Sequence, residues 1–184
     1  MWYLKWGIRV LLAVIVLTIL HYTLPQRDIV RIVDTYEERQ DFGINSIFWA
    51  SGDAGGGTAE NRDVLFIQTV KANGRTMVYR NEDTGWGWPP YFKFDTADLQ
   101  TEAADAKSTK EEPSWYAMTH YGWRSNFLSA FPNAVKLRAV EGPDVTLIPW
   151  FNIVFVILLI ALFRTIQVRV RRLWRRLRGT TEEV

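Results

Sequence analysis

The fold of this chain is decided near its middle, where residues 64–80 read VLFIQTVKANGRTMVYR. Two runs rich in β-branched and aromatic residues, a composition typical of strands, flank a short polar segment. In that segment, Asn73 and Gly74 tolerate the positive φ angles that a tight hairpin turn requires. The stretch therefore predicts a β-hairpin, and it indicates a mainly β domain around that hairpin.

The segments on either side of the hairpin extend the β pattern. We expect strands at residues 28–35, 115–121 and 135–140, and the last of these alternates apolar with basic residues as a half-buried strand does. Residues 95–106 combine a capping aspartate, early acidic residues and good helix formers, so they predict one short helix. Residues 25–146 are therefore expected to form one compact, mainly β domain, which makes the chain α+β.

Both ends of the chain are apolar. Residues 7–24 and 147–166 each approach the run of about 20 mostly apolar residues that a helix needs to cross a bilayer. Trp2 and Tyr22 lie at the two ends of the first run and Trp150 lies near the start of the second, as in the aromatic belts of membrane helices. The sequence thus predicts two transmembrane helices that flank the β domain.

Charge sets the expected orientation of these helices. Lys5 lies in the short segment before the first span, and arginines follow the second span in residues 167–184. Positive flanks stay in the cytoplasm, so we expect an inner-membrane protein with residues 1–6 and the tail cytoplasmic and the central domain periplasmic. A cleaved secretory signal is the alternative for the first span. No small-residue cleavage site follows Leu20, so we favour an uncleaved signal anchor.

The tail has an amphipathic pattern. Helical spacing places on one stripe the apolar residues Ile166, Val170, Leu173, Trp174 and Leu177. The other faces carry Arg169, Arg171, Arg172, Arg175, Arg176 and Arg178. Such a helix suits an anionic leaflet, where each basic residue contributes about 1 kcal/mol. Nucleic-acid phosphates are the alternative ligand. The adjoining span favours the arginines and Trp174 as a membrane-surface site for lipid headgroups or for an acidic subunit, and we expect no nucleic-acid partner.

An aromatic segment follows the hairpin, where residues 81–94 read NEDTGWGWPPYFKF. Its prolines and glycines exclude an ordinary strand and predict a shaped loop. In one interpretation Trp86, Trp88 and Tyr91 form a platform that binds a partner or a ligand such as a cell-wall glycan. We favour the other interpretation, in which these rings pack into the domain's own core or rest on the membrane interface.

The sequence shows no catalytic or metal-binding set. The absence of cysteine excludes thiolate nucleophiles, and His120 has no second histidine or cysteine with which to build a metal site. We interpret His120 as a hydrogen-bonded structural residue, although Ser125 or Ser129 nearby leaves a hydrolase as an alternative. Residues 51–58 are rich in glycine but lack the Gly-Lys-Ser/Thr ending of a phosphate loop, so they predict a flexible loop. We expect no cofactor, no metal and no enzymatic activity.

Several motifs resemble one known family. Residues 79–95, the sequence THYGWR at residues 119–124 and the sequence FPNA at residues 131–134 are similar to small alphaproteobacterial inner-membrane proteins known only as a domain of unknown function. The similarity covers nearly the whole chain, including both spans. The resemblance implies the same topology and compartment, and it brings no catalytic residue, cofactor or substrate.

These patterns lead to one functional prediction. Neither span carries an acidic residue or a histidine midway across, which argues against a proton relay or an ion pathway. We therefore expect a non-catalytic accessory or interaction subunit of a larger inner-membrane complex, with a membrane protein as its partner. A periplasmic ligand-binding module that uses the aromatic loop is the alternative, and a hydrolase that uses His120 is the third. The sequence gives no oligomeric state.

Overall fold

The computed structural model describes residues 2–41 and 61–179 of the chain. It divides into two compact units, Met1–Leu147 and Ile148–Val184, which we describe separately. The first unit contains α1 (Trp2–Thr23), β1 (Gln26–Asp41), β2 (Asn61–Lys71), β3 (Thr76–Asn81), α2 (Thr96–Asp105), β4 (Trp115–Tyr121) and β5 (Asn133–Val140). The second unit contains α3 (Trp150–Gly179). The glycine-rich segment at residues 51–58, predicted as a flexible loop, lies outside the described residues.

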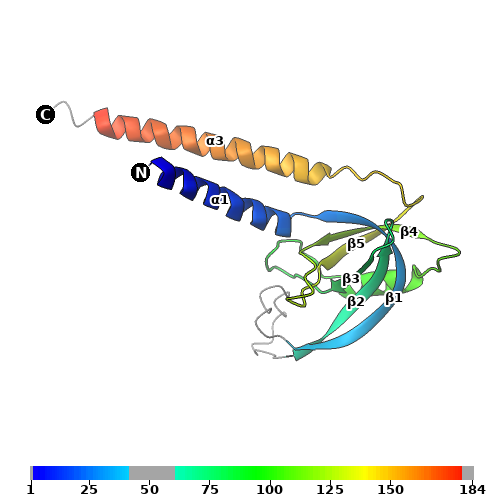
Figure 1. Ribbon diagram of the computed structural model, residues 1–184. Helices are drawn as coiled ribbons and strands as arrows, with labels where there is room; N and C mark the ends of the chain where they lie inside the picture. Colours follow the sequence, from blue (N-terminus) through cyan, green and yellow to red (C-terminus); the bar gives the residue numbers. More distant parts are fainter. Residues whose placement is uncertain (1, 42–60, 180–184) are drawn as a thin grey trace. The chain divides into compact units, whose positions relative to one another are not determined.

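The strands of the first unit close into a barrel in the order β1-β2-β3-β5-β4 (Figure 1). Neighbouring strands are antiparallel except for β3 and β5, which run parallel and meet at Arg80 and Asn133. This short parallel contact joins strands that are far apart in the sequence and completes the ring. A closed sheet leaves no edge strand exposed to pair with another chain.

The predicted hairpin is confirmed. Strands β2 and β3 pair antiparallel, and the turn between them places Gly74 at a φ of +79°. The strand predicted at residues 115–121 coincides with β4, and the strand predicted at 135–140 begins two residues earlier than expected. These elements were predictable because local alternation and turn chemistry define them.

The first strand is longer than the sequence indicated. Its β-branched run ends at Thr35, but β1 continues to Asp41 because β2 pairs with it as far as Asn61. A register shift between Ile32 and Asp34 interrupts the pairing, which is the mark of a β-bulge. Pairing with a neighbouring strand, and not local propensity, therefore sets the length of β1.

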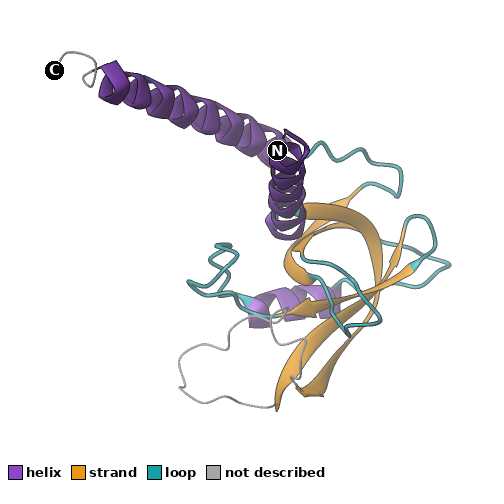
Figure 2. Cartoon of the chain, turned by 60° about the vertical axis from the view of Figure 1, so that its left-hand side comes forward, coloured by secondary structure: helices purple, strands orange, loops and turns teal. Residues whose placement is uncertain are grey.

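Helix α2 confirms the short helix that the sequence predicted at residues 95–106, and it packs against the barrel strands (Figure 2). Leu99 and Ala103 on its buried face join Val30, Tyr79 and Met118 in one apolar core. The N-terminal cap of α2 differs from the one that the sequence predicted. Asp95 occupies the N-cap position without a side-chain capping bond.

Asp83 supplies the missing cap from the loop before the helix. Its Oδ1 accepts hydrogen bonds from the backbone N–H of Thr96 at 3.0 Å and from the hydroxyl of Thr96 at 2.7 Å. Such bonds satisfy donors that the first turn of a helix otherwise leaves unpaired. The aromatic loop and α2 are thereby fixed to each other.

Helix α1 runs almost directly into the barrel. Only Leu24 and Pro25 separate it from β1. The backbone N–H of Leu24 still bonds to the carbonyl oxygen of Leu20 at 2.8 Å, and the side-chain amide of Gln26 donates to the carbonyl oxygen of His21 at 2.9 Å. No residue of α1 is buried. A bare apolar helix therefore joins the barrel without a flexible linker.

In the second unit, α3 is one continuous helix of 30 residues. It passes without interruption through residue 166, where we expected the span to end and the amphipathic tail to begin. Trp174, Arg169, Arg171, Arg172 and Arg175 are exposed, whereas the side chains of Arg176 and Arg178 lie outside the described residues. Both α1 and α3 are long and apolar enough to cross a membrane.

Candidate functional site

The structure separates the three aromatic residues that the sequence grouped as a binding platform. Trp86 and Trp88 are 81% and 72% exposed. Tyr91 is half-buried, its ring stacks on Tyr121 with centroids 4.8 Å apart, and its hydroxyl donates to the carbonyl oxygen of Thr23 at 2.7 Å. Core packing, one of the arrangements we favoured, is therefore wrong for the two tryptophans. The core is already filled by strand residues and by α2, so the loop lies outside it.

Two phenylalanines that the sequence analysis passed over complete the exposed surface of this loop. Phe92 and Phe94 are each 54% exposed, and their rings lie 5.4 Å and 5.8 Å from that of Trp86. The loop also borders a shallow pocket of about 300 Å³, lined by Tyr91, Phe92, Lys93, Phe94, Asp95 and Val135. The signal in the sequence that could have identified Phe92 and Phe94 was their position beside a segment rich in glycine and proline.

The shape of the loop is fixed by its own backbone. Gly85 adopts a φ of +51° and donates to the carbonyl oxygen of Lys93 at 3.1 Å, and the N–H of Lys93 returns a bond to the hydroxyl of Thr84 at 3.1 Å. Gly87 donates to the carbonyl oxygen of Thr84 at 2.9 Å. A Cβ at Gly87 would lie 3.1 Å from that same oxygen, so a side chain there is disfavoured. These bonds hold Trp86 and Trp88 on a defined turn.

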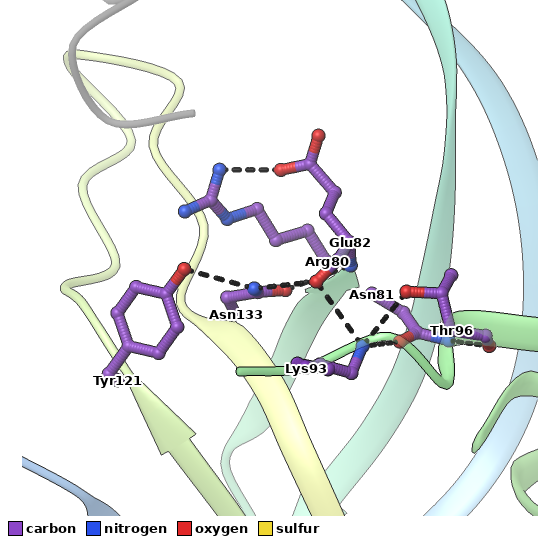
Figure 3. Close-up of polar contacts among 7 residues, drawn as sticks. All are labelled: Arg80, Asn81, Glu82, Lys93, Thr96, Tyr121 and Asn133. Atoms are coloured by element: carbon purple, nitrogen blue, oxygen red, sulfur yellow. Dashed lines mark hydrogen bonds and ion pairs between the residues drawn. The ribbon is translucent and has the colours of Figure 1, made fainter. Parts of the chain in front are cut away.

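A buried charged cluster lies at the base of the loop (Figure 3). Arg80 and Glu82, 2% and 7% exposed, form an ion pair between Nη1 and Oε2 at 2.6 Å. The ammonium of Lys93, 4% exposed, donates to Asn81 Oδ1, to the Glu82 carbonyl oxygen at 3.3 Å and to the Thr96 hydroxyl at 3.1 Å. The sequence analysis missed all of these residues, because charged side chains are ordinarily assigned to the surface.

Asparagines connect the charged residues to the barrel wall. Asn133 on β5 accepts from the N–H of Glu82 at 3.0 Å and donates to the Glu82 carbonyl oxygen at 2.9 Å and to the Tyr121 hydroxyl at 3.1 Å. Asn81 donates to the carbonyl oxygen of Thr96 and to the side-chain oxygen of Gln100, each at 2.9 Å. The cluster thus ties β3, β4, β5 and α2 together at the point where the barrel closes.

Burial changes the acid–base properties of this cluster. Burial lowers the pKa of the Lys93 ammonium to about 8, against the opposing influence of Asp83, Asp95 and Glu82. Burial likewise raises the pKa of Tyr91 and of Tyr121. The phenols therefore stay protonated at neutral pH. The hydrogen bonds within the cluster form a buried polar network, and such networks make a core more rigid.

His120 is hydrogen-bonded inside the domain, as we expected. Its Nε2 lies 3.1 Å from Asp28 Oδ2, and its ring packs against Tyr79 with centroids 5.1 Å apart. The same carboxylate oxygen accepts from the Tyr79 hydroxyl at 2.5 Å and from Lys71 Nζ at 2.6 Å. Burial acts to raise the pKa of Asp28, but the hydrogen bonds from His120, Lys71 and Tyr79 outweigh it and hold that pKa well below its usual range. The partner of His120 is thus an aspartate that three groups share.

The hydroxyl of Ser125, one of the two serines near His120, is bonded to another residue. The hydroxyl of Ser125 accepts from the N–H of Leu128 at 3.3 Å, and the backbone of Ser125 pairs with that of Ala130. The structure records no contact between His120 and either Ser125 or Ser129. Within residues 2–41 and 61–179, no group of three or more His, Asp or Glu side chains is placed to hold a metal ion.

Residues of two barrel loops contact the last turn of α1. The N–H of Gly122 donates to the carbonyl oxygen of Tyr22 at 2.9 Å, and the indole N–H of Trp123 donates to His21 Nδ1 at 2.8 Å. The ring of Tyr22 contacts those of Tyr121 and Trp123 edge-on. With the bond from Tyr91 to Thr23, three hydrogen bonds from two loops fix α1 to the barrel.

The comparisons with known proteins identify a family whose function is unknown. Residues 1–176 match the family described as protein of unknown function DUF1523. The chain belongs to this family. An uncharacterised protein of Haemophilus influenzae is 34% identical over 153 residues, which cover 82% of this chain and 82% of the relative. No solved structure matches the chain. The resemblance to an uncharacterised family is confirmed, while the alphaproteobacterial origin stays a prediction.

Proposed function

We propose that this protein is a non-catalytic accessory subunit of a larger inner-membrane complex. Helices α1 and α3 cross the membrane, both termini are cytoplasmic, and the barrel lies in the periplasm close to the bilayer. The observation that carries the proposal is the junction between α1 and the barrel. There the chain offers no flexible linker, and three hydrogen bonds join the last turn of α1 to two barrel loops.

A barrel fixed to a membrane helix in this way suits a positioning role. A tethered catalyst or receptor gains reach from a flexible linker, whereas this barrel is held at one height above the membrane. The two apolar helices present exposed side chains along their length, and such helices pack against other membrane helices through close van der Waals contact. The helices are the proposed contact surface for a membrane-protein partner, and the exposed arginines of α3 meet anionic headgroups.

The internal bonding of the polar clusters supports a non-catalytic role. Asp28, Lys93 and His120 are engaged with neighbouring protein groups. Catalytic groups normally face a cleft in which a substrate can reach them. The two buried clusters instead join strands to one another.

The topology can be tested directly because the chain contains no cysteine. Lys110→Cys places one thiol on the exposed loop before β4, and Arg172→Cys places one on α3. In cells whose outer membrane is permeabilised, an inner-membrane-impermeant maleimide should label only Lys110→Cys, and it should label both variants after lysis. Labelling of both variants, or of Arg172→Cys alone, before lysis would refute the proposed orientation.

Association is tested by photo-crosslinking in native membranes. A crosslinking amino acid placed at Ile157 on α3 should yield one defined adduct, and the attached protein should co-purify with the wild-type chain in mild detergent at fixed stoichiometry. A probe at exposed Glu111 on the barrel is the matched control, because no helix contact is expected there. A wild-type chain that purifies from membranes as a bare monomer, without such an adduct, would contradict the accessory role.

A second candidate is a periplasmic ligand-binding module, favoured by the exposed Trp86 and Trp88 and by the pocket beside them. Exposed indole rings can stack on sugar faces, and a cell-wall glycan is the ligand class that fits. Binding of solubilised glycan fragments that Trp88→Ala abolishes, with the near-ultraviolet circular dichroism unchanged, would favour this candidate. Tyr91→Ala is a poor test, because Tyr91 also holds α1.

A further inference from the structure

Among the described residues of the barrel, the large exposed aromatic side chains gather on two loops. Trp86, Trp88, Phe92 and Phe94 belong to the loop between β3 and α2, and Phe127, which is 95% exposed, belongs to the loop between β4 and β5. We call these five residues the aromatic collar. Large rings left in contact with water are unfavourable, so a surface of this kind marks a contact with another apolar phase or molecule.

Both loops are bonded to the same turn of α1. Tyr91 of the first loop donates to Thr23, and the second loop donates to Tyr22 and His21 through Gly122 and Trp123. Figure 1 shows the loop that follows β3 beside the end of α1. The collar therefore belongs to the part of the barrel that surrounds the C-terminal end of the first apolar helix.

Each of the two loops also contains a long stretch without charged residues. From Gly85 to Phe92 and from Ser125 to Val135 the sequence contains no Asp, Glu, Lys or Arg. Lys93 interrupts the first loop, but its ammonium is buried and satisfied by protein oxygens. By contrast, the segment from Asp95 to Glu112 carries acidic and basic residues throughout. The two loops bonded to α1 thus carry uncharged aromatic stretches, and the exposed charges of Asp83, Asp95 and Arg124 lie at the ends of these stretches.

From this placement we infer that the aromatic collar inserts into the outer interface of the bilayer that α1 crosses, so that the barrel rests on the membrane. The inference depends on the membrane anchoring in the proposed function. It goes further by assigning the collar to lipid and not to a protein partner or a glycan. The bound phase is the headgroup and upper acyl region of ordinary phospholipids.

Continuity with α1 is the reason to choose lipid. The exposed apolar surface of α1 leads through its last turn to the loops that carry the collar, and the phase that covers the end of the helix extends over its immediate surroundings. Tryptophan is enriched at the membrane interface, where the ring is apolar and the N–H still reaches polar groups. The uncharged stretches of the two loops, which bear Trp and Phe, satisfy the same requirement.

The test uses a nitroxide spin label on single cysteines in the full-length protein, which has no cysteine of its own. Trp88→Cys and Phe127→Cys report on the two loops of the collar, so the loss of one variant through misfolding leaves the other. Val14→Cys in the middle of α1 is the lipid reference, and Lys110→Cys on the charged loop is the water reference. Each variant is reconstituted in phosphatidylcholine vesicles with phosphatidylglycerol, and collision rates are measured with oxygen and with a water-soluble nickel chelate.

The expected result is a ratio of oxygen to nickel collisions at Trp88→Cys and Phe127→Cys that is several-fold above that at Lys110→Cys and approaches that at Val14→Cys. Water-like ratios at both collar positions, with a lipid-like Val14→Cys, would overturn the inference and leave the anchoring intact. A water-like Val14→Cys would refute anchoring and the inference together. Collar labels that neither reagent reaches would show that a second copy of the chain covers the collar, which also overturns it.

Discussion

Replacement of Glu82 by glutamine tests whether the buried ion pair holds the closing strands of the barrel together. Glu82→Gln keeps the shape of the side chain and its acceptor, but it removes the charge opposite Arg80 at a contact of 2.6 Å. Both side chains are almost fully buried, so water cannot replace the lost partner.

The magnitude follows from the burial of the remaining charge. Breaking a buried ion pair by removing one partner costs about 3–5 kcal/mol, because the other charge stays in a medium of low polarity. The amide oxygen of glutamine still accepts from the guanidinium, so we expect the lower end of that range, about 3 kcal/mol. Against a total stability of roughly 5–15 kcal/mol for a domain, such a loss is large.

The assay is urea unfolding of the full-length protein in mild detergent, followed by near-ultraviolet circular dichroism. Glu111→Gln, at an exposed loop position, is the matched control and should shift the free energy of unfolding by less than about 0.5 kcal/mol. The double variant Arg80→Met with Glu82→Leu removes both charges and should recover most of the loss, since apolar replacements of a buried pair are often neutral. A Glu82→Gln variant as stable as the control would refute the reasoning.

Three further predictions follow from the same contacts. Tyr91→Phe removes the donor to the Thr23 carbonyl oxygen and should cost about 1 kcal/mol in urea unfolding, while Tyr3→Phe on the exposed start of α1 should have no effect. Because the pKa of Asp28 is lowered in the folded chain, its contribution to stability is present above its unfolded value of 3.8 and is lost as pH falls below it. Unfolding measured from about pH 6 to about pH 2 should show a fall in stability. Asp28→Asn should reduce this fall, and Asp98→Asn on α2 should leave it unchanged. Since the pKa of Lys93 falls from 10.5 to about 8 on folding, the unfolded chain binds more protons between these values, and stability should rise with pH across this interval. Lys93→Met should remove that rise and Lys110→Met should preserve it; equal slopes in the two variants would contradict the assignment.

Local patterns in the sequence accounted for the separate elements of the fold. The turn at Asn73 and Gly74, the strand at residues 115–121 and the helix after Asp95 each depend on neighbours within a few positions, so short-range chemistry predicts them. The two apolar helices follow from composition alone. The extension of β1 to Asp41 was missed because it depends on pairing with β2.

The buried cluster could not be predicted in the same way. Arg80, Glu82 and Lys93 look like surface residues in a sequence. In the fold they are buried among protein partners, and one of these partners, Asn133, lies 51 positions beyond Glu82 and bonds to its backbone. The parallel contact between β3 and β5 that brings Asn133 there has no local signal. Burial of a charge is decided by its partners, and partners from distant strands are known only when the barrel closes.

The aromatic loop, too, was predictable only in part from the sequence. The sequence by itself determined that residues 81–94 form a shaped loop, that a hairpin and a short helix flank it, and that apolar helices occupy both ends of the chain. Only the tertiary structure decided that Tyr91 turns inward to hold α1 while Trp86, Trp88, Phe92 and Phe94 stay exposed. The physical reason is that composition fixes how apolar a segment is, whereas the direction of each ring depends on where the core already has its full complement of side chains.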